Sequence, residues 1–148
     1  MRDRLSRLLP VQKFAEQQEQ DAASELAQIM RAYQEARRTL QELIDYKAGY
    51  GKQSATPANW DACRLRDYRA FMDKLDQAIS AQRDVVDEFR RHCDASRQQW
   101  QDKHQRHESL AQLRQKIAAA ADCRAEQLAQ KAADDLAQSR SPSRPFER

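Results

Sequence analysis

The chain has almost none of the residues that build turns. Its 148 residues include two glycines and four prolines, and neither type occurs between residues 58 and 141. Aromatic residues make up only 7% of the chain, whereas charged residues make up 33%. A layered globular domain needs many turns and a thick core, so this composition argues against one and favours long helices or a coiled coil.

Motifs of enzyme active sites are missing as well. The sequence contains no glycine-rich phosphate loop, no nucleophile elbow and no Cys-x-x-Cys pair. His104 and His107 are close in sequence, but a metal site needs three or four converging ligands. We therefore predict a protein that is not an enzyme and that binds no metal, cofactor or small-molecule substrate.

Long apolar runs and strong charge of one sign are also absent. No run approaches the roughly 18 apolar residues of a membrane span. The 26 basic and 23 acidic residues are interspersed, which is typical of a solvated helical surface and not of a nucleic-acid-binding one. Cys63, Cys93 and Cys123 lie 30 residues apart, too far along a helix for disulfides. Free thiols and an intracellular location are expected.

A seven-residue apolar repeat is the main pattern that the sequence does contain. One set of positions is apolar at every step: Leu8, Ala15, Ala22, Ile29, Ala36, Leu43 and Tyr50. A second stripe advances in steps of three and four residues: Tyr68, Met72, Leu75, Ile79, Gln82, Val86, Phe89, Cys93, Ser96 and Trp100. Such a period specifies supercoiling with a partner helix and argues against intrinsic disorder, which similar composition can give.

Residues that interrupt helices place a turn between the two stripes. Gly49 and Gly51 flank Tyr50, the last position of the first stripe, and Thr56 and Pro57 suit the cap and first residue of a second helix. We predict an all-α domain over residues 1–148, a long antiparallel two-helix coiled-coil hairpin. Its predicted parts are helix one at about 9–50, a turn at about 51–56, a longer helix two at about 57–138 and a frayed tail at 139–148.

Pro10 and the turn set two further expectations. Because proline is tolerated only in the first helical turn, the firm part of helix one should begin near residue 9 or 10. With the turn centred near residue 55, residues 109–138 should extend beyond the paired region for about 45 Å. The apolar residues of this overhang include Leu110, Leu113, Ile117 and Leu128. They should bind another molecule, unless the alanine-rich helix persists through propensity alone.

A surplus of apolar side chains lies near the turn. Ile44, Tyr46, Phe71 and Ala78 fall one step outside the predicted seam. A two-helix bundle cannot bury a flank as well as a seam, so we predict a protein-binding patch here. The alternative is a local rotation of the supercoil that places Phe71 inside.

These segments resemble a known family. Leu43-Ile44-Asp45-Tyr46, the following Tyr50 and the segment from Tyr68 to Ile79 resemble the FliJ family of flagellar export components. The resemblance implies a non-enzymatic cytoplasmic stalk of the flagellar type III export apparatus, held near the inner membrane at the flagellar base through protein partners. The implied partners are the hexameric export ATPase, the cytoplasmic part of the membrane export gate, and the export chaperones that it escorts.

The resemblance also implies binding residues. Carried over by position, the gate-binding face contains Leu43, Tyr46, Tyr50, Phe71, Leu75, Ala78 and, at its margin, Gln82. Gln82 and Thr39 depart from the family's pattern. Leu110, Leu113, Ile117 and Leu128 of the overhang are expected in the ATPase ring. Three alternatives stay open: a generic coiled-coil adaptor, the equivalent stalk of a virulence type III secretion system, and a self-associating dimer of long helices.

Overall fold

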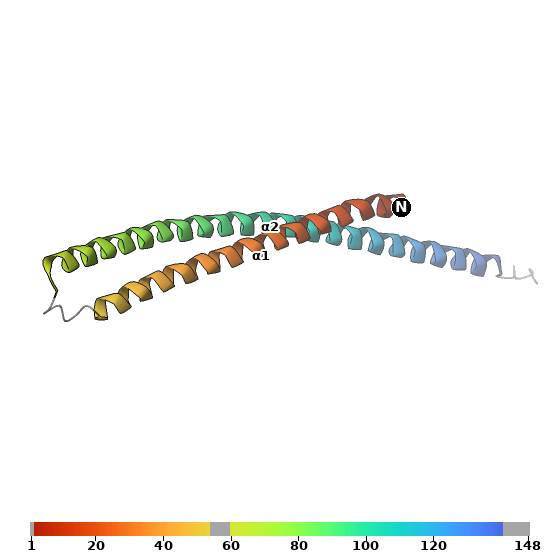
Figure 1. Ribbon diagram of the computed structural model, residues 1–148. Coiled ribbons are helices and arrows are strands. Elements are labelled where there is room, and N and C mark those ends of the chain that lie inside the picture. The colour runs from red at the N-terminus through yellow and green to blue at the C-terminus, as the bar shows by residue number, and fades with distance from the viewer. Residues whose placement is uncertain (1, 54–59, 141–148) are drawn as a thin grey trace, which may run out of the picture. The chain divides into compact units, whose positions relative to one another are not determined.

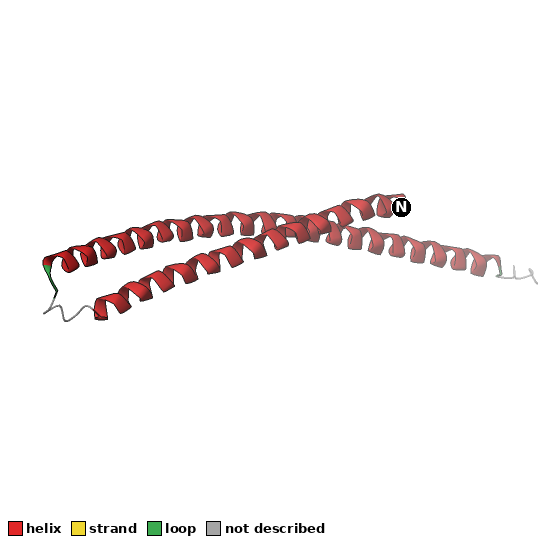
Figure 2. Ribbon diagram, in the orientation of Figure 1, coloured by secondary structure: helices red, strands yellow, loops and turns green. Residues whose placement is uncertain are grey.

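Two long helices make up the described part of the chain. The computed structural model describes residues 2–53 and 60–140, in which α1 spans Arg2–Gln53 and α2 spans Ala62–Ser139 (Figure 1). Among these residues Figure 2 shows no strand, and only a short loop precedes α2. The predicted all-α architecture, with a longer second helix, is confirmed.

The chain divides into two compact units, each built from one stretch of each helix. Unit 1 combines Met1–Gln17 with His104–Arg148, and unit 2 is Gln18–Lys103. In unit 2 the amide of Gln82 donates to the carbonyl oxygen of Ala36 at 3.0 Å. Nearer the other end of this unit, Lys103 Nζ donates to Gln18 Oε1 at 3.3 Å. As the residue number on α1 increases, the number of the paired residue on α2 decreases, so the two helices of unit 2 are antiparallel.

The predicted heptad positions form the seam. Every position of the second predicted stripe, from Tyr68 to Trp100, is buried or half-buried. The buried residues are small or medium in size: Ala15, Ala36, Leu75, Ile79, Cys93 and Ser96. Small side chains let the helices approach closely, while only one narrow stripe of each helix leaves the solvent. The contacts between α1 and α2 are therefore concentrated in a thin seam within each unit.

The start of α1 differs from the prediction near residue 9 or 10. α1 begins at Arg2, and Pro10 lies inside the helix. Proline removes one backbone donor and crowds the preceding turn, which costs helix stability. Leu5 and Leu8, however, are half-buried in unit 1. Burial of these two side chains favours a helix that extends before Pro10, an effect that the proline rule alone does not include.

The start of α2 also differs from the prediction of residue 57. Trp60 and Asp61 precede the helix, which begins at Ala62. Asp61 is the N-cap, because its Oδ1 accepts a hydrogen bond from the backbone N–H of Arg64 at 2.8 Å. Thr56 and Pro57, to which the prediction assigned the cap and the first turn, lie outside the described residues.

The unpaired stretch of α2 is shorter than predicted. In unit 1, Arg114 donates to Gln12 Oε1 at 3.2 Å, so α1 already pairs with residues beyond 109. Half-buried positions continue to Ala121, and all described residues from 122 to 140 are exposed. Because α2 begins later than expected, each α1 residue faces a position further along α2, and the earlier start of α1 lengthens the paired part. The overhang thus begins near residue 122.

Candidate partner-binding surfaces

Three aromatic rings lie together close to the end of α1 in unit 2. Tyr46 and Tyr50 are one helical turn apart, and their ring centroids are 5.4 Å apart. Phe71 reaches them from α2, with centroid distances of 4.9 Å to Tyr50 and 6.4 Å to Tyr46. The rings are tilted or edge-on to one another, as aromatic pairs prefer. We call Tyr46, Tyr50 and Phe71 the aromatic cluster.

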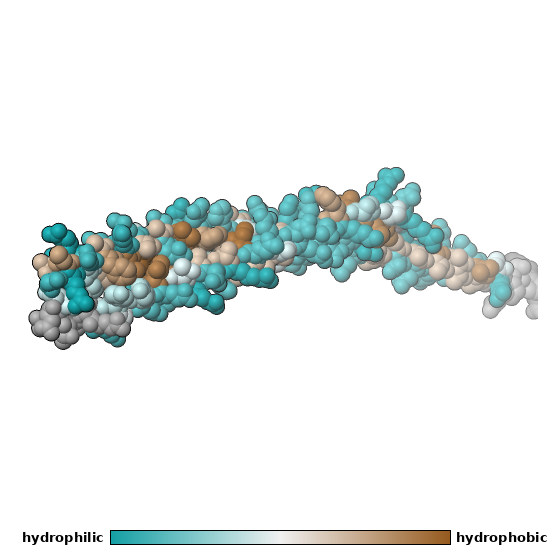
Figure 3. All heavy atoms as spheres, in the orientation of Figure 1, coloured by the Kyte–Doolittle hydropathy of each residue, from teal (hydrophilic) through white to brown (hydrophobic). Residues whose placement is uncertain are grey.

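The aromatic cluster remains substantially in contact with solvent. Tyr46 is 52% exposed and Tyr50 is 37% exposed, while Phe71 is half-buried. On the face drawn in Figure 3, hydrophobic side chains gather on unit 2 close to its helix connection. The surplus predicted near the turn is therefore present, and a local rotation of the supercoil does not remove it.

The structure separates the residues of the predicted gate-binding face by depth. Ala78 is exposed, Leu43 is half-buried, and Leu75 is only 8% exposed. Leu75 is thus part of the buried seam and offers little surface to a partner. The amide of Gln82 is occupied by the carbonyl of Ala36. The accessible part of the predicted face consists of the three rings, Leu43 and Ala78.

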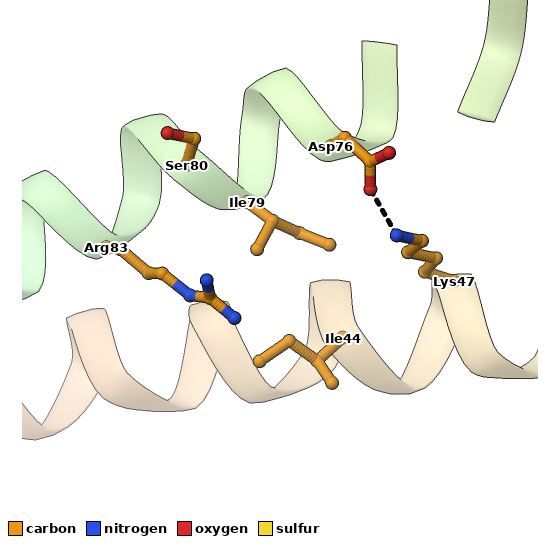
Figure 4. Close-up of a pocket in the computed structure, with 6 residues that line it drawn as sticks. All are labelled: Ile44, Lys47, Asp76, Ile79, Ser80 and Arg83. Carbon is orange, nitrogen blue, oxygen red and sulfur yellow. Dashed lines mark hydrogen bonds and ion pairs between the residues drawn. The ribbon is translucent and has the colours of Figure 1, made fainter. Parts of the chain in front are cut away.

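Ile44 belongs to the other flank of unit 2, which corrects its predicted place in the patch. Residues two apart lie about 200° apart around a helix, so Ile44 and Tyr46 point to different sides. Figure 4 shows Ile44 facing Ile79, beside the ion pair between Lys47 and Asp76. Together with Ser80 and Arg83, these residues line a hollow of about 310 Å³. Ile44 is half-buried there, so this flank is polar at its rim and apolar at its floor.

A second aromatic pair lies at the start of α2, outside the predicted binding residues. The rings of Trp60 and Tyr68 meet edge to face at a centroid distance of 5.2 Å. They line an open hollow of about 390 Å³ together with Tyr50, Arg64, Asp67 and Phe71. The signal that could have found it is the N-cap at Asp61. With α2 starting at Ala62, the ring of Trp60, which precedes the helix, packs against the ring of Tyr68 on it.

The apolar residues predicted for the ATPase ring lie in unit 1. Leu110 and Ile117 are half-buried within the paired part, whereas Leu113 is 45% exposed. Leu128 belongs to the unpaired stretch and is 69% exposed. Only Leu113 and Leu128 of the four predicted residues are therefore broadly accessible in this unit.

The cysteines and histidines form no metal centre in the described part of the chain. No group of three or more His, Cys, Asp or Glu side chains is placed to hold an ion there. Cys63 and Cys123 are exposed free thiols, and Cys93 is a buried free thiol in the seam. Burial raises the pKa of the Cys93 thiol, because the thiolate loses its hydration there.

No stretch of the described helices is both long and apolar enough to cross a membrane.

Comparison with known proteins decides the family. A family model described as "Flagellar FliJ protein" matches residues 4–144 of the chain. The chain belongs to the flagellar FliJ protein family. This membership confirms the resemblance seen in the sequence. It makes the chain a component of flagellum biogenesis and flagellar protein export.

Two curated FliJ relatives match the chain over most of its length. The "Flagellar FliJ protein" of Escherichia coli (strain K12) is 29% identical over 140 residues, which cover 93% of this chain and 95% of that protein. The protein of the same name from Salmonella typhi is 28% identical over 134 residues, covering 89% and 91%. Coverage of this extent includes both helices and both units. Membership in the FliJ family favours the flagellar assignment over the virulence-system and generic-adaptor alternatives.

Proposed function

We propose that the chain is a non-enzymatic stalk of the flagellar type III export apparatus. Its aromatic cluster binds the cytoplasmic part of the export gate, its unit 1 docks in the export ATPase ring, and it escorts export chaperones. The single observation that supports the proposal most directly is the exposure of Tyr46 and Tyr50 beside Phe71 in a FliJ-family chain. The chain then works in the cytoplasm and reaches the membrane only through its partners.

The aromatic cluster has the properties of a protein-binding hot spot. Tyrosine is enriched at such sites, because its ring supplies apolar contact area while its hydroxyl can still form a hydrogen bond. Both tyrosines stand on a continuous helix, and the ring contacts with Phe71 hold them near their observed positions. Binding therefore orders few additional groups, which lowers its entropic cost.

Unit 1 offers a different kind of surface. The stretch of α2 from 122 to 139 is helical although every residue in it is exposed, and it carries Leu128 and Leu136 at 69% and 61% exposure. A helix that buries nothing depends on its own propensity, and an apolar stripe on it gains stability when a partner covers it. A ring of ATPase subunits that encloses this stretch supplies such cover.

The gate assignment is tested with a double variant, Tyr46→Ala with Phe71→Ala. Binding of the full-length variant to the purified cytoplasmic part of the gate is measured by isothermal titration calorimetry. We expect the affinity to fall by about tenfold or more, because two ring anchors are lost. Met30→Ala with Val85→Ala removes two side chains of comparable exposure, 38% and 37%, elsewhere in unit 2 and serves as the control. Undiminished binding of the first variant removes the assignment.

A further inference from the structure

The hollow at the start of α2 shares two of its walls with the aromatic cluster. Tyr50 and Phe71 belong to the cluster, and both also line the hollow that Trp60 and Tyr68 close from the other side. The two aromatic groups are therefore one continuous surface of unit 2. A partner that covers Tyr50 and Phe71 must also lie along the rim of the hollow.

We propose that this hollow is a second anchor point for the export gate and takes an apolar side chain from the gate's cytoplasmic part. The inference rests on the proposed function, since it extends the surface that binds the gate. Four rings line this open hollow of about 390 Å³, a volume sufficient for an aliphatic or aromatic side chain. Trp60 does not belong to the predicted gate-binding face, and it is the principal contact in this proposal.

Two charged side chains at the hollow indicate which groups of the partner would lie beside the inserted side chain. Arg64 and Asp67 are one turn apart on α2 and both line the hollow. A guanidinium donates hydrogen bonds and a carboxylate accepts them. Together they suit the carbonyl and N–H groups that flank an inserted side chain on a partner's backbone. The combination of apolar walls and a polar rim is the usual composition of an interface core and its edge.

Calorimetry with single variants separates this inference from the proposed function. Trp60→Ala and Tyr46→Ala are each titrated with the cytoplasmic part of the gate, with Leu65→Ala as the control. Leu65 is 37% exposed on the first turns of α2 and does not line the hollow. We expect both aromatic variants to bind about tenfold more weakly than the wild type, and the control to bind normally. Weakened binding of Tyr46→Ala alone overturns the hollow and leaves the gate proposal standing.

A spectroscopic measurement covers the case in which Trp60→Ala perturbs the helix start. The full chain is labelled with 5-fluorotryptophan and titrated with unlabelled gate fragment, so only Trp60 and Trp100 give ¹⁹F signals. Trp100→Phe assigns the two signals, and Trp100 itself is half-buried in the seam. A shift of the Trp60 signal with little change at Trp100 supports the hollow. Saturable gate binding without a Trp60 shift overturns it, and absence of any gate binding overturns both proposals.

Discussion

At the scale of single residues, position in the seam decides the role of each apolar side chain. Ile79 and Tyr46 are both in unit 2, yet Ile79 is 7% exposed and Tyr46 is 52% exposed. Burial of a large aliphatic side chain stabilises the fold by about 1.5–3 kcal/mol, whereas an exposed ring contributes little to it. Ile79 therefore serves the stability of unit 2, and Tyr46 is free to serve binding.

Ile79→Ala is expected to lower the free energy of unfolding by about 2–3 kcal/mol, near the lower end for such a substitution because the seam is thin. Chemical denaturation followed by circular dichroism measures the loss. Val85→Ala, at a position that is 37% exposed on the same helix, should cost less than about 1 kcal/mol. Equal losses for the two variants contradict the assignment of Ile79 to the seam.

Cys93 should differ from Cys63 and Cys123 in its reaction with iodoacetamide. The thiolate is the reactive form, and burial both shields Cys93 and raises its pKa. Timed alkylation and mass spectrometry should show Cys63 and Cys123 modified well before Cys93. Alkylation of all three cysteines at one rate in the folded protein contradicts the burial of Cys93.

The raised pKa of Cys93 also predicts the direction in which the free energy of unfolding changes with pH. The folded protein keeps the Cys93 proton to higher pH than the unfolded chain does. The contribution of this thiol to stability is complete below the ordinary thiol range. It declines as the pH rises through that range towards the folded-state pKa. Cys93→Ser removes the titrating thiol and should reduce this decline in unfolding experiments.

At the scale of the helices, the period of the sequence predicted the seam, whereas local signals misplaced the ends. The steps from Tyr68 to Trp100 correspond to buried or half-buried positions, because a 4-3 repeat leaves little choice of facing side. The proline at position 10 and the Thr56-Pro57 pair pointed to helix starts that the structure replaces with Arg2 and Ala62. Helix ends depend on tertiary packing and on competing caps, which a local pattern does not reveal.

The cap at Asp61 can be tested by itself. Asp61→Ala removes the acceptor of the Arg64 N–H and should destabilise the start of α2 by about 1 kcal/mol. Amide hydrogen exchange should then be faster in the first turn of α2, while Asp61→Asn should keep most of the protection because asparagine is an equally good cap. Unchanged exchange in Asp61→Ala shows that another group holds this end.

The candidate site was predictable only in part, for a related reason. Tyr46 and Phe71 were found because they do not fit the seam, and the structure leaves Tyr46 exposed. Ile44 was misassigned because a surplus residue can lie on either flank, and only the orientation of the helix decides which. The contact between Trp60 and Tyr68 was not predicted, because it depends on where α2 begins.

At the scale of the whole molecule, the two units are proposed to bind different partners. Unit 2 carries the aromatic cluster, and unit 1 carries the exposed stretch of α2 with Leu128. Variants in one unit should therefore leave the partner of the other unit bound. A generic adaptor that binds through one seam-like surface would not show this independence.

Co-purification with the export ATPase, followed by an assay of ATP hydrolysis, shows whether the two units bind different partners. The wild type and the Tyr46→Ala, Phe71→Ala variant should both bind the ATPase and stimulate hydrolysis. A Leu113→Ala, Leu128→Ala variant, altered at exposed positions of unit 1, should bind and stimulate less. Absence of binding and stimulation by the wild type, or equal loss in both variants, contradicts the assignment of the ATPase ring to unit 1.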